Sequence, residues 1–419
     1  MVPFPLSRLA CAVLALALAA CGPAETATPQ PQPPTVSPAT ATAPLPADTP
    51  TIAAVASPTG VPATAAPTLA PTDTPIPLVL DPLTGLQVDD PAVLARPPLA
   101  IKIANFPRAV RAAQSGLSQA DNVWEVYAEG GVTRFNAIFW SHTPDRVGNV
   151  RSARLLDALI MDAYQALLVT SGSSSGTMDR LREDPERYQR VVAEATGYGG
   201  CPVLCREASA SLTTNKLFTQ PAAVWALAAE RALAGAPTFA GHLFAAQPPA
   251  GTPITTVHLD WQLNNTIAEW RYDAGIGRYW RWIDSADTAP GNPGLVQHID
   301  TLNNEPIVAD TIAMVIVPHV PSNIVVDDGV AKQFSYDVLF TGTGPARVFR
   351  DGVMITGTWR REAGKGQLPR FFDEAGNPIA FKPGVTWFAV YSADSPETIT
   401  TETATFQSRF KAPGLSTAP

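Results

Sequence analysis

The long segment between Gly22 and Val79 most constrains what this chain can fold into. It consists largely of Pro, Thr and Ala, and it contains no Lys, no Arg and no aromatic residue. A stretch of this composition cannot bury enough apolar surface to offset the entropy that folding would remove. Because frequent proline favours extended conformations, we expect residues 21–79 to be a disordered, semi-stiff tether, with all folded structure following it.

Residues 1–20 have the pattern of a secretory signal peptide. Arg8 precedes an apolar run that is too short to span a bilayer, and small residues lead up to Cys21. The ending at Cys21 resembles the lipobox of bacterial lipoproteins, in which the cysteine is acylated and becomes the new N-terminus. The alternative is an ordinary signal peptide cut after Ala20, which would leave a free thiol. We expect a protein anchored in a bacterial membrane by lipid on Cys21 and facing outside the cytoplasm.

The remaining chain is long enough to form two ordinary domains with a sizeable core. It belongs to a sequence of 419 residues with 46% hydrophobic residues and a formal net charge of −8. No other apolar stretch approaches the length of a membrane span, so lipid would supply the only strong membrane attachment. The acidic balance provides no basic surface for nucleic acid, which we therefore do not expect as a partner.

Cys201 and Cys205 are the two cysteines that remain after the signal and the lipidation site. An oxidising exterior favours a disulfide between them. Free thiols and a zinc pair are the alternatives, but zinc needs four ligands and no histidine lies nearby in sequence. The chain also lacks the HExxH and P-loop motifs. We expect a disulfide, no metal site and no cofactor.

Alternating and periodic patterns predict a mixed α/β domain over residues 80–240. Strand-like alternation and helix-like segments follow one another in this half of the folded chain. The segments concerned are 99–105, 122–128, 133–140, 153–165, 166–170, 178–182 and 219–234. We therefore expect a sheet with helices packed on it.

The pattern changes after a Pro- and Gly-containing segment at 237–253, which we interpret as a joint between domains. Short strand-like segments separated by turn residues follow it. They predict a mainly β domain over 254–395, either a sandwich or an open barrel. The fold class expected for the whole chain is α+β, preceded by the disordered Pro/Thr/Ala-rich linker.

The densest group of charged side chains lies around one predicted hairpin. Glu125 and Glu129 lie four residues apart, so a strand would place both on one face. A Gly-Gly turn then leads to Arg134, and Arg151 and Arg154 stand where a helix is expected to begin. If the two strands pair, the acids and the arginines can meet, and these five residues form the candidate ligand-binding site.

Two interpretations of this cluster stay open. Acids that face arginines commonly form a buried ion-pair network, in which loss of one partner is costly. The arginines could instead bind an anionic or sugar-like ligand, since guanidinium groups near a helix start suit phosphate or carboxylate. The paired acids could also perform acid–base catalysis, but carboxylate pairs in strands are too common to establish it.

Aromatic side chains are concentrated in the second half. They include Trp261, Trp270, Trp280, Trp282, Trp359 and Trp387. Such rings fill the core of a small β domain, or they stack on sugars and partner proteins. His298 and Asp300 are close enough in sequence to pair within a turn, for which a structural role is favoured over a catalytic one.

Three ordered blocks of sequence resemble the DUF3048 family of YerB-like lipoproteins. They are the segments 114–121 (QSGLSQAD), 129–134 (EGGVTR) and 150–154 (VRSAR). The resemblance continues into the second half, through Gly342-Thr-Gly344, Gly357-Thr-Trp359 and Pro383-Gly-Val-Thr-Trp387, and covers roughly residues 80–395. Family members tend to carry a Pro-His-Asn group near residues 213–215, where only Asn215 matches here.

The resemblance implies a tethered envelope lipoprotein with an N-terminal and a C-terminal unit and no assigned activity. We expect the folded part to bind an envelope component or protein, such as peptidoglycan, an anionic wall polymer or a cell-wall synthesis protein. An enzyme acting on cell-wall glycan or a lipid-linked phosphate precursor is the first alternative, and a scaffold for cell-wall synthesis proteins is the second. An open cleft with an unpaired acid would favour the enzyme.

Overall fold

A computed structural model of the chain describes residues 78–207, 216–233, 235–261, 266–285, 294–327 and 333–410. The expected signal peptide, the lipidation site Cys21, nearly all of the expected tether and residues 213–215 lie outside these ranges. Within the ranges, no helix is both long and apolar enough to cross a membrane.

The first half of the folded part mixes helices with strands. The described α-helices are α1 (Leu155–Tyr164), α2 (Ser175–Arg182), α3 (Pro185–Gln189) and α4 (Pro221–Glu230). Short 3-10 helices are η1 (Pro91–Ala95), η2 (Arg108–Ala113), η3 (Leu117–Gln119) and η4 (Glu194–Thr196). The strands are β1 (Leu99–Ala104), β2 (Asn122–Ala128), β3 (Val132–Phe139), β4 (Val147–Gly148), β5 (Leu167–Val169), β6 (Val191–Val192), β7 (Cys205–Arg206) and β8 (Leu217–Thr219).

The second half is built from strands. They are β9 (Thr252–Pro253), β10 (Thr256–Trp261), β11 (Thr266–Asp273), β12 (Arg278–Asp284), β13 (Leu295–Gln297), β14 (Ile299–Asp300), β15 (Glu305–Pro306), β16 (Val308–Ala309), β17 (Thr311–Val317), β18 (His319–Asp327), β19 (Gln333–Val338), β20 (Gly342–Arg350), β21 (Val353–Arg361), β22 (Arg370–Asp373), β23 (Thr386–Ser392), β24 (Glu397–Ile399) and β25 (Thr403–Ser408). The expected α+β class, mixed first and mainly β afterwards, is confirmed.

Strands from both halves form one large sheet. Its order is β22-β21-β20-β17-β23-β2-β3-β1-β5-β6, with β9 pairing with β21. The halves meet where β2 runs parallel to β23, with Asn122 opposite Thr386 and Glu125 opposite Ala389. The described residues of both predicted domains fall within one compact unit. The boundaries at residues 240 and 254 therefore stay a prediction about sequence organisation.

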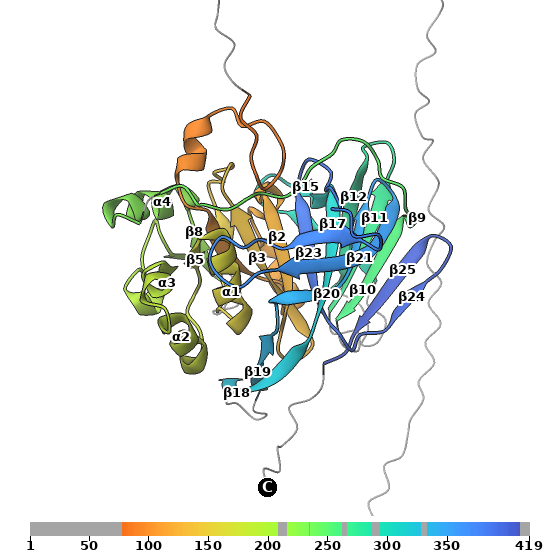
Figure 1. Ribbon diagram of the computed structural model, residues 1–419. Coiled ribbons are helices and arrows are strands. Elements are labelled where there is room, and N and C mark those ends of the chain that lie inside the picture. The colour runs from red at the N-terminus through yellow and green to blue at the C-terminus, as the bar shows by residue number, and fades with distance from the viewer. Residues whose placement is uncertain are drawn as a thin grey trace, which may run out of the picture. The chain divides into compact units, whose positions relative to one another are not determined.

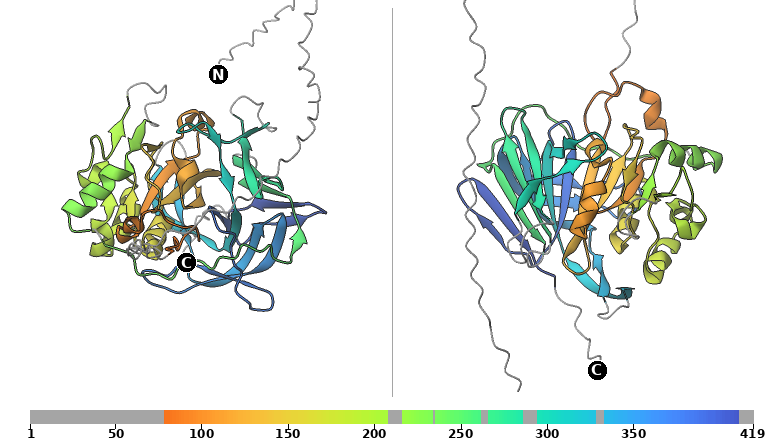
Figure 2. Two further views of the ribbon diagram at one scale, coloured as in Figure 1. Left: turned by 90° about the horizontal axis from the view of Figure 1, so that it is seen from above. Right: turned by 180° about the vertical axis from the view of Figure 1, so that it is seen from behind.

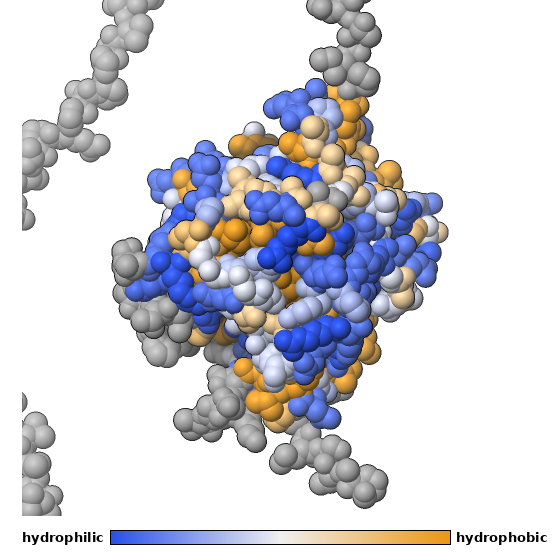
Figure 3. Space-filling view, turned by 90° about the vertical axis from the view of Figure 1, so that its left-hand side faces the viewer, coloured by the Kyte–Doolittle hydropathy of each residue, from blue (hydrophilic) through white to orange (hydrophobic). Residues whose placement is uncertain are grey.

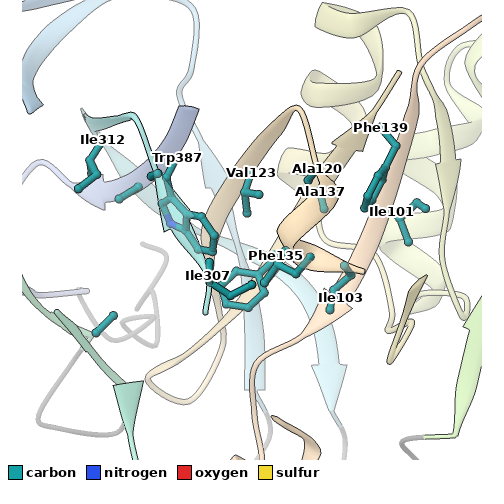
Figure 4. Close-up of a cluster of buried hydrophobic side chains, with 14 of the residues drawn as sticks. Ile101, Ile103, Ala120, Val123, Phe135, Ala137, Phe139, Ile307, Ile312 and Trp387 are labelled. Carbon is teal, nitrogen blue, oxygen red and sulfur yellow. The ribbon is translucent and has the colours of Figure 1, made fainter. Parts of the chain in front are cut away.

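A second sheet, ordered β13-β12-β11-β10-β25-β24, packs against one face of the large sheet. The rings of Trp270 and Trp387 meet across this interface with centroids 4.9 Å apart. Phe135, Ile307 and Trp387 lie together in the same core (Figure 4). These aromatic contacts bury large apolar areas, which is the main stabilising contribution between two packed sheets.

Helices α1 and α2 lie on the other side of the large sheet, away from the second sheet (Figures 1 and 2), whereas the buried side chains of α4 join the core on the second sheet's side. Helix α1 is fixed there by the phenol of Tyr164, which accepts a hydrogen bond of 2.9 Å from the indole of Trp124 on β2. The surface on this side mixes hydrophilic and hydrophobic side chains (Figure 3). The large sheet is thus buried on both faces, as its apolar strands require.

Local sequence signals explain where the helices begin. Pro221 occupies the first turn of α4, where its missing N–H leaves no hydrogen bond unmade. Ser174 caps α2 by accepting from the amide of Thr177, and Asp184 caps α3 in the same way. The start of α2 matters for the candidate site, because α2 and α1 both begin beside it.

Candidate functional site

Four of the five predicted site residues line one cavity, and the fifth lies in a different place. Glu129, Arg134, Arg151 and Arg154 line a cavity of about 430 Å³, which we call the arginine cleft. Glu125 is fully buried outside it. The two acids do not share a strand face as expected, because β2 ends at Ala128 and Glu129 belongs to the turn that follows.

Glu125 belongs to a closed polar network in the core between the two sheets. Its carboxylate accepts two hydrogen bonds from Arg281, at 2.8 and 3.0 Å, and both side chains are fully buried. The carboxylate also accepts from the indole of Trp387 at 3.1 Å and from the hydroxyl of Thr133 at 2.9 Å. Every charge is matched here, so this part of the predicted cluster is a structural ion pair.

The network continues from Arg281 to His298 and Gln114. Arg281 Nη1 lies 2.8 Å from His298 Nδ1, and His298 Nε2 lies 2.5 Å from Gln114 Oε1. Burial, and then repulsion from Arg281, holds the pKa of His298 well below its ordinary value. The imidazole is therefore neutral, accepting from the guanidinium and donating to the amide oxygen. Asp300 does not take part, because it accepts from the amides of Gly116 and Ser118 instead.

The arginine cleft is arranged differently, because it gathers several guanidinium groups around one open cavity. Arg154 Nε donates to Glu129 Oε2 at 2.5 Å, with 12% and 6% of the two side chains exposed. Arg134 Nη1 donates to the carbonyl oxygen of Ser152 at 2.5 Å. Arg151 is partly exposed in the same cavity. Among the described residues, the lining of the cleft thus contains three guanidinium groups and one carboxylate.

The pKa values show what it costs to gather these cations. Burial, followed by repulsion from Arg154 and Arg151, holds the pKa of Arg134 well below its ordinary range. Burial and repulsion from Arg154 also lower the pKa of Arg151. Arginine stays protonated even so, and the lowered values mean that its charged form is destabilised here. A bound anion would relieve this destabilisation.

A buried ion pair beneath the cleft positions Arg154. Lys102 Nζ lies 2.7 Å from Asp157 Oδ1, and both side chains are fully buried. Asp157 also accepts from the side-chain amide of Asn136 at 3.0 Å and from the backbone N–H of Arg154 at 2.7 Å. The pair cancels its own charge, so its effect is to fix the start of α1 and the arginine that precedes it.

The sequence did not single out two serines that complete the cleft. Ser173 and Ser174 line it at the start of α2, and Ser174 is the N-cap of that helix. Helix starts carry a partial positive charge from their amides, which adds to the attraction for an anion. The serines lie in a loop that reads Gly172-Ser-Ser-Ser-Gly176, a Gly-x-Ser-x-Gly pattern centred on Ser174. Their position beside the arginines depends on the packing of α2.

Cys201 and Cys205 are joined by a disulfide, with their Cα atoms 4.5 Å apart. Cys205 is the first residue of β7, and neither cysteine lines the arginine cleft. Among the described residues, no group of three or more His, Cys, Asp and Glu side chains is arranged to hold a metal ion. The chemistry that the cleft offers is thus the recognition of an anion by arginine and hydroxyl groups.

The fold and the cleft define a mixed α+β protein in which two sequence regions build one body with a polar, positively charged cavity. Two family models match those regions: the N-terminal domain of a protein of unknown function, DUF3048, over residues 83–234, and the corresponding C-terminal domain over residues 257–388. The chain belongs to the DUF3048 family, and the resemblance predicted from its motifs is confirmed.

The chain is also similar to a named protein of this family. It is 28% identical over 313 residues to "Putative lipoprotein YerB" of Bacillus subtilis (strain 168), which covers 74% of this chain and 85% of the relative. The crystal structure of YerB from Bacillus subtilis matches with a TM-score of 0.61 and 26% identity, covering 75% of this chain and 97% of the solved chain. The similarity therefore extends over nearly the whole folded part.

Proposed function

We propose that this protein is a lipid-anchored lipoprotein, facing outside the cytoplasm, that binds an anionic component of the cell envelope in the arginine cleft without turning it over. Lipid on Cys21 and the tether at 21–79 would hold the folded part away from the membrane surface. The relative YerB carries the description lipoprotein in its name, which supports the anchor.

One observation carries the binding proposal. The guanidinium groups of Arg134, Arg151 and Arg154 converge on one cavity, where Arg154 also holds Glu129. Like charges repel, so gathering three guanidinium groups around one cavity carries a cost in free energy. A bound anion would offset this repulsion, and guanidinium groups bind phosphate or carboxylate oxygens through strong charge-assisted hydrogen bonds.

The environment of the two acids supports binding over catalysis. A general base needs a carboxylate that is free to take a proton from a substrate. Glu129 is engaged by Arg154, and Glu125 is enclosed by Arg281 in the core. Of the described residues that line the cleft, none is a free carboxylate, so the enzyme alternative lacks the general base that would favour it.

Binding of the full chain, solubilised in detergent, to defined anions tests the proposal. The probes are inorganic phosphate, a glycerol phosphate polymer and purified peptidoglycan, measured by calorimetry or by co-sedimentation. We expect R151A/R154A to bind the phosphate probes at least ten-fold more weakly, because a hydrogen bond to a charged group contributes about 1.5–3 kcal/mol.

A matched control removes the same charge elsewhere. Arg347 pairs with Glu397, and Arg360 lies over the ring of Phe372, both outside the cleft. R347A/R360A should bind like the wild type, since its cleft is intact. Equal binding by R151A/R154A and the wild type, with both proteins folded, would rule out the anion site. Release of a C21S variant from the membrane fraction would test the anchor separately.

A further inference from the structure

Trp280 and Trp282, on strand β12 of the second sheet, face away from the protein core. Trp261 on β10 and Trp270 on β11 are fully buried against the large sheet, and this packing fills the inner face. Trp280 and Trp282 both lie on β12, where side chains alternate between faces, and both remain partly exposed on the outer face. Their rings lie two residues apart on a strand, which places them about 7 Å from each other.

Neighbouring side chains hold both indole rings in fixed orientations. The indole N–H of Trp280 donates to Asp273 at 3.0 Å. The guanidinium of Arg271 lies over the Trp282 ring, 4.2 Å from its centroid. Glu269 in turn accepts from Arg271 at 2.6 Å and lies 3.0 Å from His258 Nδ1. The two rings are thus pre-organised on a sheet, which lowers the entropy that a ligand would have to remove on binding.

Charges of both signs occur on this outer face. Glu269 sits between His258 and Arg271, and its pKa is lowered first by the hydrogen bond from His258. Asp273 is the other acid beside the rings, and it is held by the indole of Trp280. The face therefore differs from the arginine cleft, where three guanidinium groups converge. A strongly charged ligand would gain little here, whereas a neutral one would not be repelled.

The face also differs from a typical protein-binding patch. The described residues of β10, β11 and β12 contribute none of the exposed large aliphatic side chains, and the exposed Val296 of β13 lies opposite Ile283, one position away from Trp282. Across the strands, Trp282 lies beside Glu269 on β11 and Gln297 on β13, and His258 lies beside Thr405 on β25. Flat aromatic rings surrounded by donors and acceptors suit a ligand that has apolar ring faces and hydroxyl groups on its rim.

We propose that the outer face of β10–β13 binds a neutral glycan chain, with Trp280 and Trp282 as stacking platforms for its sugar rings. His258, Arg271 and Gln297 provide hydrogen-bonding groups around them. Two platforms on one strand suit an extended chain of rings better than a single sugar. This site is independent of the anion site, because none of its residues lines the arginine cleft.

Calorimetry with two neutral probes, β-1,4-linked hexamers of glucose and of N-acetylglucosamine, tests the proposal on the full chain in detergent. We expect binding of at least one hexamer by the wild type, and at least five-fold weaker binding by W280A and W282A. R151A/R154A should bind the hexamer like the wild type. Thermal unfolding of each variant shows whether its fold is kept.

Phe372 provides a matched control, because its partly exposed ring also lies beneath a guanidinium, that of Arg360, on a different sheet. F372A should bind the hexamer normally. If W282A does not fold, Trp282→Leu keeps much of the apolar area without the flat ring, and it should still bind at least five-fold more weakly. Failure of the wild type to bind either hexamer, or wild-type affinity in folded W280A and W282A, would overturn the proposal and leave the rings a purely cross-strand packing role.

Discussion

The core network around Glu125 and the arginine cleft use the same residue types for opposite purposes. Both contain Glu and Arg, and their acids are only four residues apart in the chain. In the core network, Arg281 and Glu125 match each other and no part of either side chain reaches solvent. In the cleft, three arginines line an open cavity, and Arg154 holds Glu129. The core network and the arginine cleft therefore differ in how their charged groups are arranged, although they contain the same residue types.

This difference has a physical basis. An unmatched charge in a closed core costs several kcal/mol, so a dry polar network is stable only when it is complete. A cavity that opens to water can hold unmatched charges at lower cost, because water and ions screen them. The three guanidinium groups of the cleft are tolerated together because the cavity is open to water, and the same opening lets a ligand enter. Each prediction below tests one side of this contrast.

Breaking the core network should have the largest effect. Glu125→Gln leaves Arg281 buried without its counter-charge, so we expect the free energy of unfolding to fall by about 3–5 kcal/mol in denaturant titrations. E125Q/R281M removes both charges and should recover at least half of the loss. A double variant no more stable than E125Q would mean that the pair is needed for more than mutual neutralisation.

Acidification should have the next largest effect on the free energy of unfolding, through His298 in the same network. A pKa held below the ordinary value of about 6.5 means that the folded state favours the neutral ring. Its stabilising contribution is therefore present above about pH 6.5 and is lost as pH falls, by up to about 2 kcal/mol at pH 5. The difference in unfolding free energy between wild type and H298Q should shrink over this range. Other titrating groups, such as Asp81 with its pKa raised to about 6 by burial, cancel in that difference.

The sequence predicts contacts between residues that are close in the chain better than contacts between residues that are far apart in it. The hairpin of β2 and β3 was predicted because its two strands and its Gly-Gly turn are contiguous, and the structure pairs Val126 with Arg134. The partner of Glu125 could not be predicted, because Arg281 is 156 residues further along the chain. A sequence motif shows which residues are present. Which side chains of β2 face the second sheet depends on the pairing of β2 with β23, a strand far away in the sequence.

The same limit explains the error about Glu129. Period-two alternation places Glu125 and Glu129 on one face only while the strand continues, and here β2 ends at Ala128. Strand ends are set by where pairing stops, which depends on distant residues. The arginines could be grouped from the sequence because Arg151 and Arg154 lie within one short segment, and the structure places both in one cavity with Arg134.

The cleft should respond to substitution with the opposite sign from the core. Arg151→Met removes a repelling charge, so without ligand we expect the unfolding free energy to be unchanged or up to about 1 kcal/mol higher. Phosphate should raise the melting temperature of the wild type more than that of R151M, because a ligand that binds only the folded state stabilises it. Marked destabilisation of R151M without ligand would place Arg151 among the structural residues.

The smallest expected effect concerns Glu129. It distinguishes the effect of the negative charge of Glu129 from its effect on the orientation of the Arg154 side chain. Glu129→Gln keeps an oxygen that can accept from Arg154 Nε but removes the negative charge, so phosphate affinity should rise about two-fold to four-fold. Glu129→Ala removes the acceptor as well and frees the Arg154 side chain, which should cancel that gain. Equal affinities for E129Q and E129A would show that the acid acts through its charge alone. Lower affinity in E129Q than in the wild type would instead show that the cleft needs a carboxylate to hold Arg154 in its binding position.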